Sequence, residues 1–145
     1  MDTQNPREEI KIWQRVRGES TITDGLPGLA LSALTQAAVY DALMRQLQGY
    51  SRKLAIQLRE AQLENARCIK GIYRISSGSV LPVTTVPPVT EQLENVLRKS
   101  YGQSLKAYNA YQARANHPEY GAIFQYLAAK EQTLCCKIAE LMSII

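Results

Sequence analysis

Apolar residues recur along most of the chain at the three- and four-residue spacing of helices that bury one face. Glycine and proline residues interrupt this pattern and divide the chain into four long segments. We therefore predict four bundle helices, over residues 29–48, 51–76, 90–115 and 118–145. The predicted fold class is all-α, with residues 1–145 forming one four-helix-bundle domain.

Two segments lie outside the predicted bundle helices. Residues 1–28 form an N-terminal lead-in with a short amphipathic helix near residues 7–17, on which Trp13 is the candidate anchor, followed by a loop. Residues 77–89 contain three prolines and have no helical period, which predicts an extended connection. A connection of this length allows the second and third bundle helices to run parallel.

The last predicted helix has a polar residue in the middle of its apolar stripe. The stripe consists of Phe124, Leu127, Leu134, Ile138, Leu141 and Ile145. The position that should continue it is Glu131. A carboxylate facing the core is costly unless hydrogen bonds or protonation compensate for its burial. Glu131 is therefore the first candidate functional residue.

Two other predicted helices also carry polar side chains at inward positions. Gln62 and Asn65 continue the stripe of the second helix, and Ser104 continues that of the third. We expect these three side chains to donate hydrogen bonds to Glu131, each contributing roughly 1.5–3 kcal/mol if the carboxylate is charged. The hydroxyls of Tyr108 or Tyr111 are candidates to join them. A protonated Glu131 is the alternative. The inward face of the first helix is ambiguous, and Ala37 is one candidate on it.

Composition and charge narrow the function classes. The net charge of +4 comes from basic residues interleaved with acidic ones, which is typical of a solvated surface rather than of a nucleic-acid interface. No apolar run reaches the length of a membrane span, and the first residues do not resemble a signal peptide. The three cysteines lack metal-site spacing, so we expect reduced, mostly buried thiols and a cytoplasmic protein.

Three stretches of the sequence resemble a known family. Residues 67–74, 117–128 and 12–16 are similar to the rubrerythrin-like members of the ferritin-like superfamily, found in anaerobic bacteria. The resemblance implies a ferritin-like four-helix bundle with a long crossover between its second and third helices. In di-iron members of this superfamily, glutamates and histidines of the four helices point inward and bind two irons.

The resemblance also implies where such ligands would stand in this chain. The corresponding positions are Ala37, Gln62, Asn65, Ser104, Glu131 and Leu134. Only Glu131 keeps a ligand of the expected type, and neutral amides are poor ligands for iron. We therefore interpret the site as a degenerate di-iron site and expect no bound metal and no cofactor.

Three hypotheses for function follow. The favoured one is a non-enzymatic structural or interaction role, as a homodimer, without nucleic acid or membrane partners. The second is a rubrerythrin-type peroxidase or oxidase that binds iron at a remodelled site, in which Glu131 is helped by Asp41, Glu60 or Glu64. The third is a small-molecule pocket in the emptied site, lined by Tyr101, Tyr108 and Tyr111.

Overall fold

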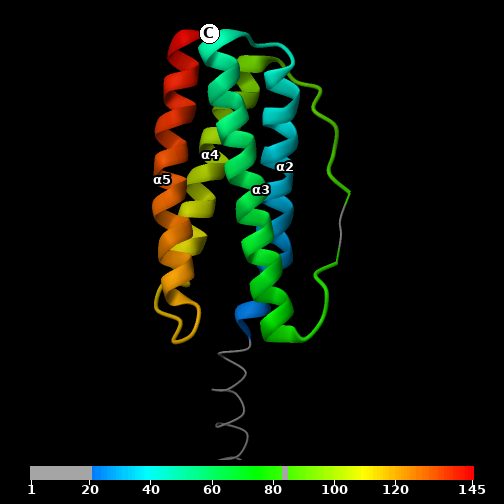
Figure 1. Ribbon diagram of the computed structural model, residues 1–145, viewed down its shortest axis with the longest axis vertical. Helices are drawn as coiled ribbons and strands as arrows, with labels where there is room; N and C mark the ends of the chain where they lie inside the picture. Colours follow the sequence, from blue (N-terminus) through cyan, green and yellow to red (C-terminus); the bar gives the residue numbers. More distant parts are fainter. Residues whose placement is uncertain (1–20, 83–84) are drawn as a thin grey trace, which may run out of the picture.

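The structure, a computed structural model, describes residues 21–82 and 85–145, and the regular elements in these ranges are all helical. A short 3-10 turn, Thr21–Thr23, precedes four long helices. They are α2 (Leu26–Met44), α3 (Gly49–Ser77), α4 (Leu93–Gln112) and α5 (Gly121–Ile144). The predicted four-helix bundle is confirmed (Figure 1). The short helix predicted near residues 7–17 lies outside the described residues.

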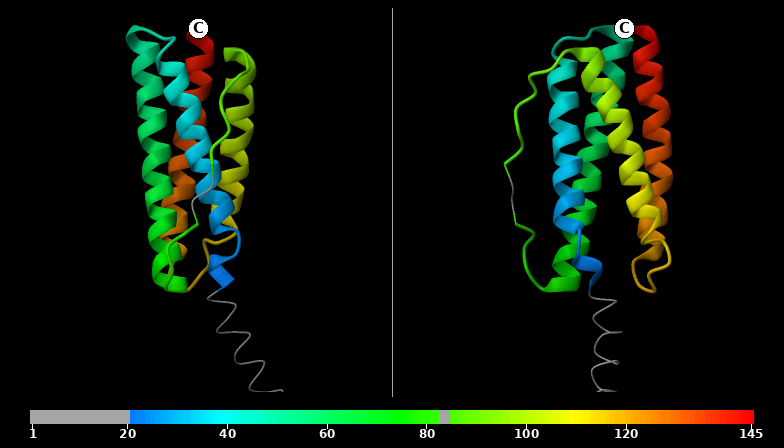
Figure 2. Two further views of the ribbon diagram at one scale, coloured as in Figure 1. Left: turned by 90° about the vertical axis from the view of Figure 1, so that its right-hand side faces the viewer. Right: turned by 180° about the vertical axis from the view of Figure 1, so that it is seen from behind.

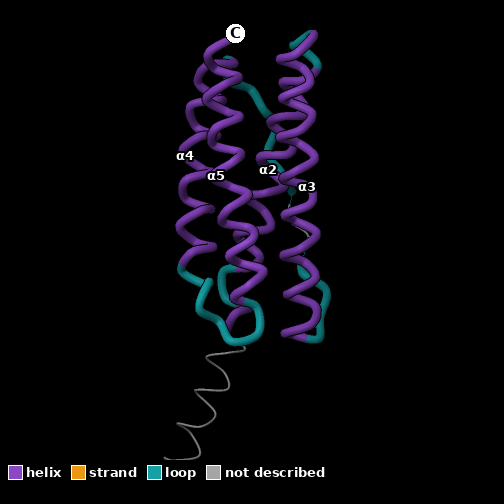
Figure 3. The backbone as a smooth tube through the Cα atoms, turned by 60° about the vertical axis from the view of Figure 1, so that its left-hand side comes forward, coloured by secondary structure: helices purple, strands orange, loops and turns teal. Residues whose placement is uncertain are grey.

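The four helices pack as two antiparallel pairs. The pair α2 and α3 lies beside the pair α4 and α5, as Figure 3 shows. Helices α3 and α4 run in the same direction, and α2 and α5 run in the opposite one (Figure 1). The described parts of the segment between α3 and α4 pass along the outside of α2 (Figure 2). Leu81 holds this segment against the bundle, because its side chain is buried in the apolar core.

The first two helices begin earlier than the sequence pattern predicts. The lead-in loop was expected to continue to residue 28, but α2 begins at Leu26 with Pro27 in its first turn. Proline suits this position because its fixed φ is helical and its missing N–H needs no partner there. Gly25 turns the chain into the helix with a left-handed φ of 81°. α3 begins at Gly49 rather than at 51, after a reversal in which Gly49 itself has a φ of 60°.

The last two helices begin later than predicted. The third helix was expected to begin at residue 90, but α4 begins at Leu93 after an extended Gln92. Pro118 was expected in the first turn of the last helix, but α5 begins at Gly121. His117 explains this delay, because its Nδ1 accepts hydrogen bonds from the backbone N–H groups of Glu119 and Tyr120 and holds them in a turn.

The core of the bundle consists of two apolar clusters with a polar layer between them. One cluster contains Ile22, Leu26, Ala30, Ile69, Ile72, Leu81, Tyr111, Tyr120, Phe124, Leu127 and Ala128. The other contains Tyr40, Leu43, Leu47, Leu54, Ala55, Leu58, Val96, Leu97, Leu134, Ile138 and Leu141. In each helix, buried polar residues lie between the residues of one cluster and those of the other. These polar residues are Gln36, Gln62, Asn65, Ser100, Ser104 and Glu131. None of the described helices carries an apolar stretch long enough to cross a membrane.

Candidate functional site: the polar layer around Glu131

The polar layer lies at the middle of the bundle because each helix places polar residues between its two apolar ends. In α3, Gln62 and Asn65 follow buried Leu58 and precede buried Ile69. In α5, Glu131 lies four residues after Leu127 and three residues before Leu134, so all three lie on one face of the helix. All of these side chains therefore point toward the same level of the core.

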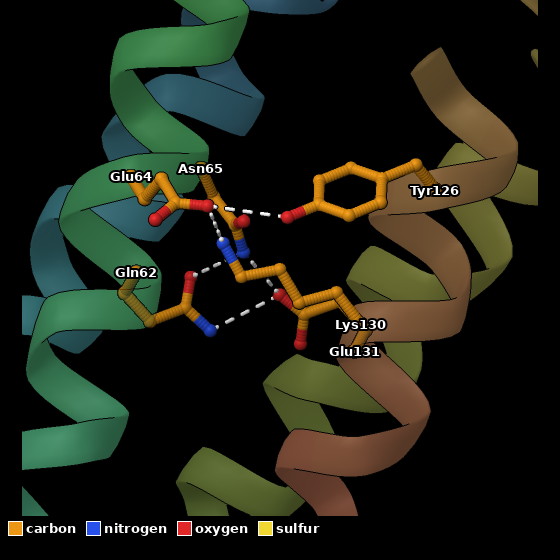
Figure 4. A network of polar contacts seen from close by, with 6 residues as sticks. All are labelled: Gln62, Glu64, Asn65, Tyr126, Lys130 and Glu131. Carbon is orange, nitrogen blue, oxygen red and sulfur yellow. Dashed lines mark hydrogen bonds and ion pairs between the residues drawn. The ribbon is translucent and has the colours of Figure 1, made fainter. Parts of the chain in front are cut away.

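Glu131 is fully buried and is held by two amide side chains of α3. The Nε2 atom of Gln62 and the Nδ2 atom of Asn65 each donate a hydrogen bond of 3.0 Å to Glu131 Oε1. Asn65 Nδ2 also lies 3.3 Å from Gln62 Oε1, so the two amides orient each other. Figure 4 shows both amides reaching from α3 across to Glu131 on α5. The network thus joins the two helix pairs through the centre of the bundle.

Burial raises the pKa of the Glu131 carboxyl above its usual value, because desolvation disfavours the charged form. The hydrogen bonds from Gln62 and Asn65, the nearby Ser104 hydroxyl and the Lys130 ammonium lower that pKa and only partly offset the effect of burial. Both amide donors bind Oε1, which leaves Oε2 available to carry a proton. The layer can therefore hold Glu131 as a neutral acid whose Oε1 is the accepting carbonyl oxygen.

Several polar atoms in the layer have no hydrogen-bond partner among the described residues. They are Gln36 Oε1, Tyr40 Oη, Asn65 Oδ1, Ser104 Oγ and Glu131 Oε2. Buried polar atoms are almost always hydrogen-bonded in folded proteins, so each of these atoms adds a desolvation cost to this part of the core. Desolvation also raises the pKa of the Tyr40 and Tyr111 hydroxyls, so both stay protonated donors.

A charged cluster on the surface covers the seam between α3 and α5 next to the buried network. Glu64 forms an ion pair of 2.8 Å with Lys130 and accepts a hydrogen bond of 3.2 Å from the Tyr126 hydroxyl (Figure 4). The Lys130 ammonium also lies 5.7 Å from the centre of the Tyr126 ring. The Lys130 contacts lower the pKa of the Glu64 carboxyl. The cluster therefore links α3 and α5 at the residues that directly precede Asn65 and Glu131 in the sequence.

The structure brings together part of the residue set expected from the sequence. Gln62 and Asn65 contact Glu131, and Ser104 is buried beside them, close enough for its hydroxyl to lower the pKa of the Glu131 carboxyl. Ala37 and Leu134 are buried apolar neighbours of the layer.

The tyrosines expected around the site divide between core and surface. Tyr111 is buried in an apolar cluster, where desolvation raises the pKa of its hydroxyl. The Tyr108 hydroxyl is bonded to Gln112 instead, at 3.2 Å. Tyr101 is 38% exposed and lines no described part of the polar layer. Tyr101 therefore lies on an outer face of α4, and the pocket lined by these three tyrosines stays a prediction.

The acidic residues considered as extra ligands do not reach Glu131. Asp41 pairs with Arg45 and Arg59, and Glu60 pairs with Arg59, on the outer surface. Glu64 pairs with Lys130 across the α3–α5 seam.

Sequence reasoning missed two residues of the polar layer and one tyrosine bordering it. Gln36 is 7% exposed and Tyr40 is fully buried, four residues apart on α2. Ser100 is buried one turn before Ser104 on α4, where its hydroxyl lowers the pKa of Tyr40. The four-residue spacing of each pair was a usable signal. It was hidden in α2, because this helix is apolar on nearly all sides and shows no clear inward face.

The donor set does not fit a di-iron centre. A metal ion needs lone pairs, whereas Gln62 and Asn65 point N–H groups at the one carboxylate present. Within residues 21–82 and 85–145, no three histidine, cysteine or acidic side chains gather closely enough to hold a metal ion. Cys68, Cys135 and Cys136 form no disulfide, and of the three only Cys135 is buried.

Comparison of the chain with protein-family models, curated proteins and solved structures finds no match.

Proposed function

We propose that the protein is a non-enzymatic interaction module built on a ferritin-like bundle whose di-iron site has become a metal-free polar layer. The observation that carries this proposal is the pair of amide N–H groups that meet on Glu131 Oε1 at 3.0 Å. This arrangement stabilises an anion or a neutral acid and repels a cation. A polar layer of this kind fixes the register in which four helices pack, because a slipped helix would leave buried polar groups unpaired.

Helix directions support the ferritin-like part of the proposal. α3 and α4 run parallel, and the described parts of residues 78–92 pass along α2 between their ends (Figures 1 and 2). A four-helix bundle with one long crossover has this connectivity. The three free thiols suit a reducing compartment, so we place the protein in the cytoplasm.

A surface of α4 supports the interaction role. Tyr101 and Leu105 are 38% and 43% exposed and lie one turn apart, so they form an apolar strip on the outer face of this helix. We propose that two copies of the chain form a homodimer by packing these strips together.

Light scattering after size-exclusion chromatography tests the dimer. We expect twice the chain mass of 16.2 kDa for the unmodified protein and a monomer for Leu105→Lys. Ile75→Lys is the matched control, because Ile75 is 75% exposed on a different helix and should leave the dimer intact. A monomeric unmodified protein would contradict this part of the proposal.

Elemental analysis tests the metal-free layer. Protein purified from medium supplemented with iron and manganese should contain no stoichiometric metal, whereas about two metals per chain would contradict the metal-free layer and favour the oxidoreductase alternative. A variant with restored ligands provides the positive control, because it should regain iron if the ferritin-like register is right. Its substitutions are Ala37→Glu, Gln62→Glu, Asn65→His, Ser104→Glu and Leu134→His.

A further inference from the structure

A groove of about 430 Å³ lies at the end of α3, between the last turns of this helix and the segment that follows it. It is lined by Lys70, Gly71, Arg74 and Ile75 of α3 and by Val80 and Leu81 of the segment. Figure 1 shows this end of α3, where the chain turns back along the bundle. The groove lies on a different helix from the α4 strip of Tyr101 and Leu105, so it is a separate surface.

The groove carries two positive charges and no acidic side chain. Lys70 and Arg74 lie one turn apart on α3, both are exposed, and neither forms an ion pair with a described residue. Between Glu64 and Glu91 the sequence contains three basic residues, of which Arg67 is the third, and no acidic one. A partner that brings carboxylates to this groove therefore gains opposite charges and meets no like charge.

The groove also contains the two most exposed large apolar side chains of the described residues. Ile75 is 75% exposed on the α3 side, and Val80 is 66% exposed on the other side. Gly71 leaves open space on the α3 side, because a Cβ atom there would meet no atom within 4 Å. One apolar side chain of a partner can therefore enter over Gly71 and contact both walls. Grouped exposed apolar residues with a charged rim are typical of interaction surfaces.

We propose that this groove binds an acidic peptide segment of a partner protein. The segment places an apolar side chain over Gly71, between Ile75 and Val80, and its carboxylates pair with Lys70 and Arg74. The proposal rests on the interaction role argued above and names a partner for it, at a surface that the homodimer does not use.

The shape and lining of the groove favour a peptide over other anionic partners. Ile75 and Val80 lie on two walls of a hollow, so an inserted side chain contacts both, whereas a flat membrane surface would reach only their outer ends. Single-stranded nucleic acids bind by stacking their bases on aromatic side chains, and none of the described residues that line the groove is aromatic.

Fluorescence anisotropy with a fluorescein-labelled peptide, Ser-Glu-Glu-Leu-Leu-Glu-Glu-Ser, tests the site on the full chain. We expect saturable binding that weakens as the NaCl concentration rises from about 50 to about 500 mM, because salt screens exposed charges. A peptide with serine in place of both leucines should bind at least about 3-fold more weakly, since it loses the apolar contact. A peptide with lysine in place of the four glutamates should not bind.

Charge reversal on α3 tests the rim of the groove. Lys70→Glu combined with Arg74→Glu should weaken binding at least about 5-fold, because repulsion replaces two attractive pairs. Arg52→Glu combined with Lys53→Glu is the matched control: it makes the same charge change at exposed positions near the other end of α3. This control should weaken binding less than about 2-fold, since charges beyond the screening length contribute little.

Filling the hollow tests the apolar part of the site. Gly71→Phe should abolish binding, because its ring can enter the open space over α3. Gly28→Phe is the matched control, since a Cβ atom there also meets nothing within 4 Å and Gly28 does not line this groove. Absent saturation, or equal binding by either variant and its control, would overturn the proposal.

Two other results would assign the groove to a different occupant and so overturn the proposal. The first is binding to phosphatidylserine vesicles that Lys70→Glu with Arg74→Glu abolishes, without peptide binding. The second is a change in the fluorescence of Trp13, the one tryptophan, in the same variant without peptide binding, which would indicate residues 1–20 of the chain itself. Neither result alters the mass in solution or the metal content, which test the interaction role separately.

Discussion

Replacing Glu131 by glutamine should stabilise the protein increasingly as the pH rises. The substitution keeps the shape of the side chain and its Oε1 acceptor, so the hydrogen bonds from Gln62 and Asn65 can remain. Its new NH₂ group takes the place of Oε2, which has no partner, and the Ser104 hydroxyl beside it also lacks one. What the substitution removes is the cost of placing a negative charge in the core.

The sign of the pH effect follows from the raised pKa of Glu131. Between the usual value of 4.5 and the higher value in the folded protein, the folded state binds a proton that the unfolded state has released. The free energy of unfolding therefore falls as the pH rises through this window, by at most about 1.4 kcal/mol per pH unit for one group. Glutamine does not titrate, so Glu131→Gln loses this slope. Its advantage should be smallest below pH 4.5 and should level off above the folded pKa.

Urea unfolding followed by circular dichroism between pH 4 and pH 9 measures this difference. Glu64→Gln is the matched control. Glu64 is an exposed carboxylate whose pKa is lowered by Lys130, so its negative charge stabilises the folded protein above the usual pKa and ceases to do so at low pH. The substitution removes this stabilisation, so Glu64→Gln should be destabilising at high pH only. The two variants should therefore show opposite pH trends. A free-energy difference for Glu131→Gln that stays constant over this range, or that turns unfavourable as the pH rises, would refute a desolvated carboxyl at this position.

Further substitutions test the core and the turns by the same unfolding measurement. Asn65→Leu should destabilise by about 1–3 kcal/mol, because Glu131 loses one of its two donors, and adding both Gln62→Leu and Glu131→Leu, which leaves no member of the network unpaired, should recover much of the loss; a triple variant no better than the single one would contradict the network. Leu58→Ala should cost about 2–5 kcal/mol, because Leu58 is fully buried, and a loss below 1 kcal/mol would mean that its cluster is loosely packed. Gly121→Ala should cost at least about 1 kcal/mol, since its Cβ atom would lie 2.4 Å from the Ala115 carbonyl oxygen, whereas Gly71→Ala, with open space around its Cβ, should stabilise the exposed helix by up to about 1 kcal/mol.

The sequence determines the helices and much of the polar layer. The spacing of Leu127, Glu131 and Leu134 requires one inward face on α5. The same rule places Gln62 and Asn65 inward on α3. Helix periodicity is a local property of the backbone, so it can be read from one segment at a time. Because α3 and α5 both carry polar residues at inward positions, the sequence also predicts that Gln62 and Asn65 contact Glu131.

Helix ends and turns were less predictable, because several residues at these places favour more than one structure. Pro27 was expected in a loop but lies in the first turn of α2. Pro118 was expected in the first turn of a helix but lies in a turn before α5. In the second case the imidazole of His117 binds the backbone N–H groups that follow it, and a composition rule does not capture this contact.

Only the tertiary structure decided which face of α2 points inward and where the groove lies. α2 is apolar on nearly every side, so Gln36 could not be distinguished from a surface residue until the neighbouring helices were in place. The groove at the end of α3 depends on the burial of Leu81 in the core, which holds the connecting segment against the bundle. The amino-acid pattern thus determined the helices and the cost of burying Glu131. The packing of one helix pair against the other decided which groups compensate for that cost, because only that packing fixes the distances between residues on different helices.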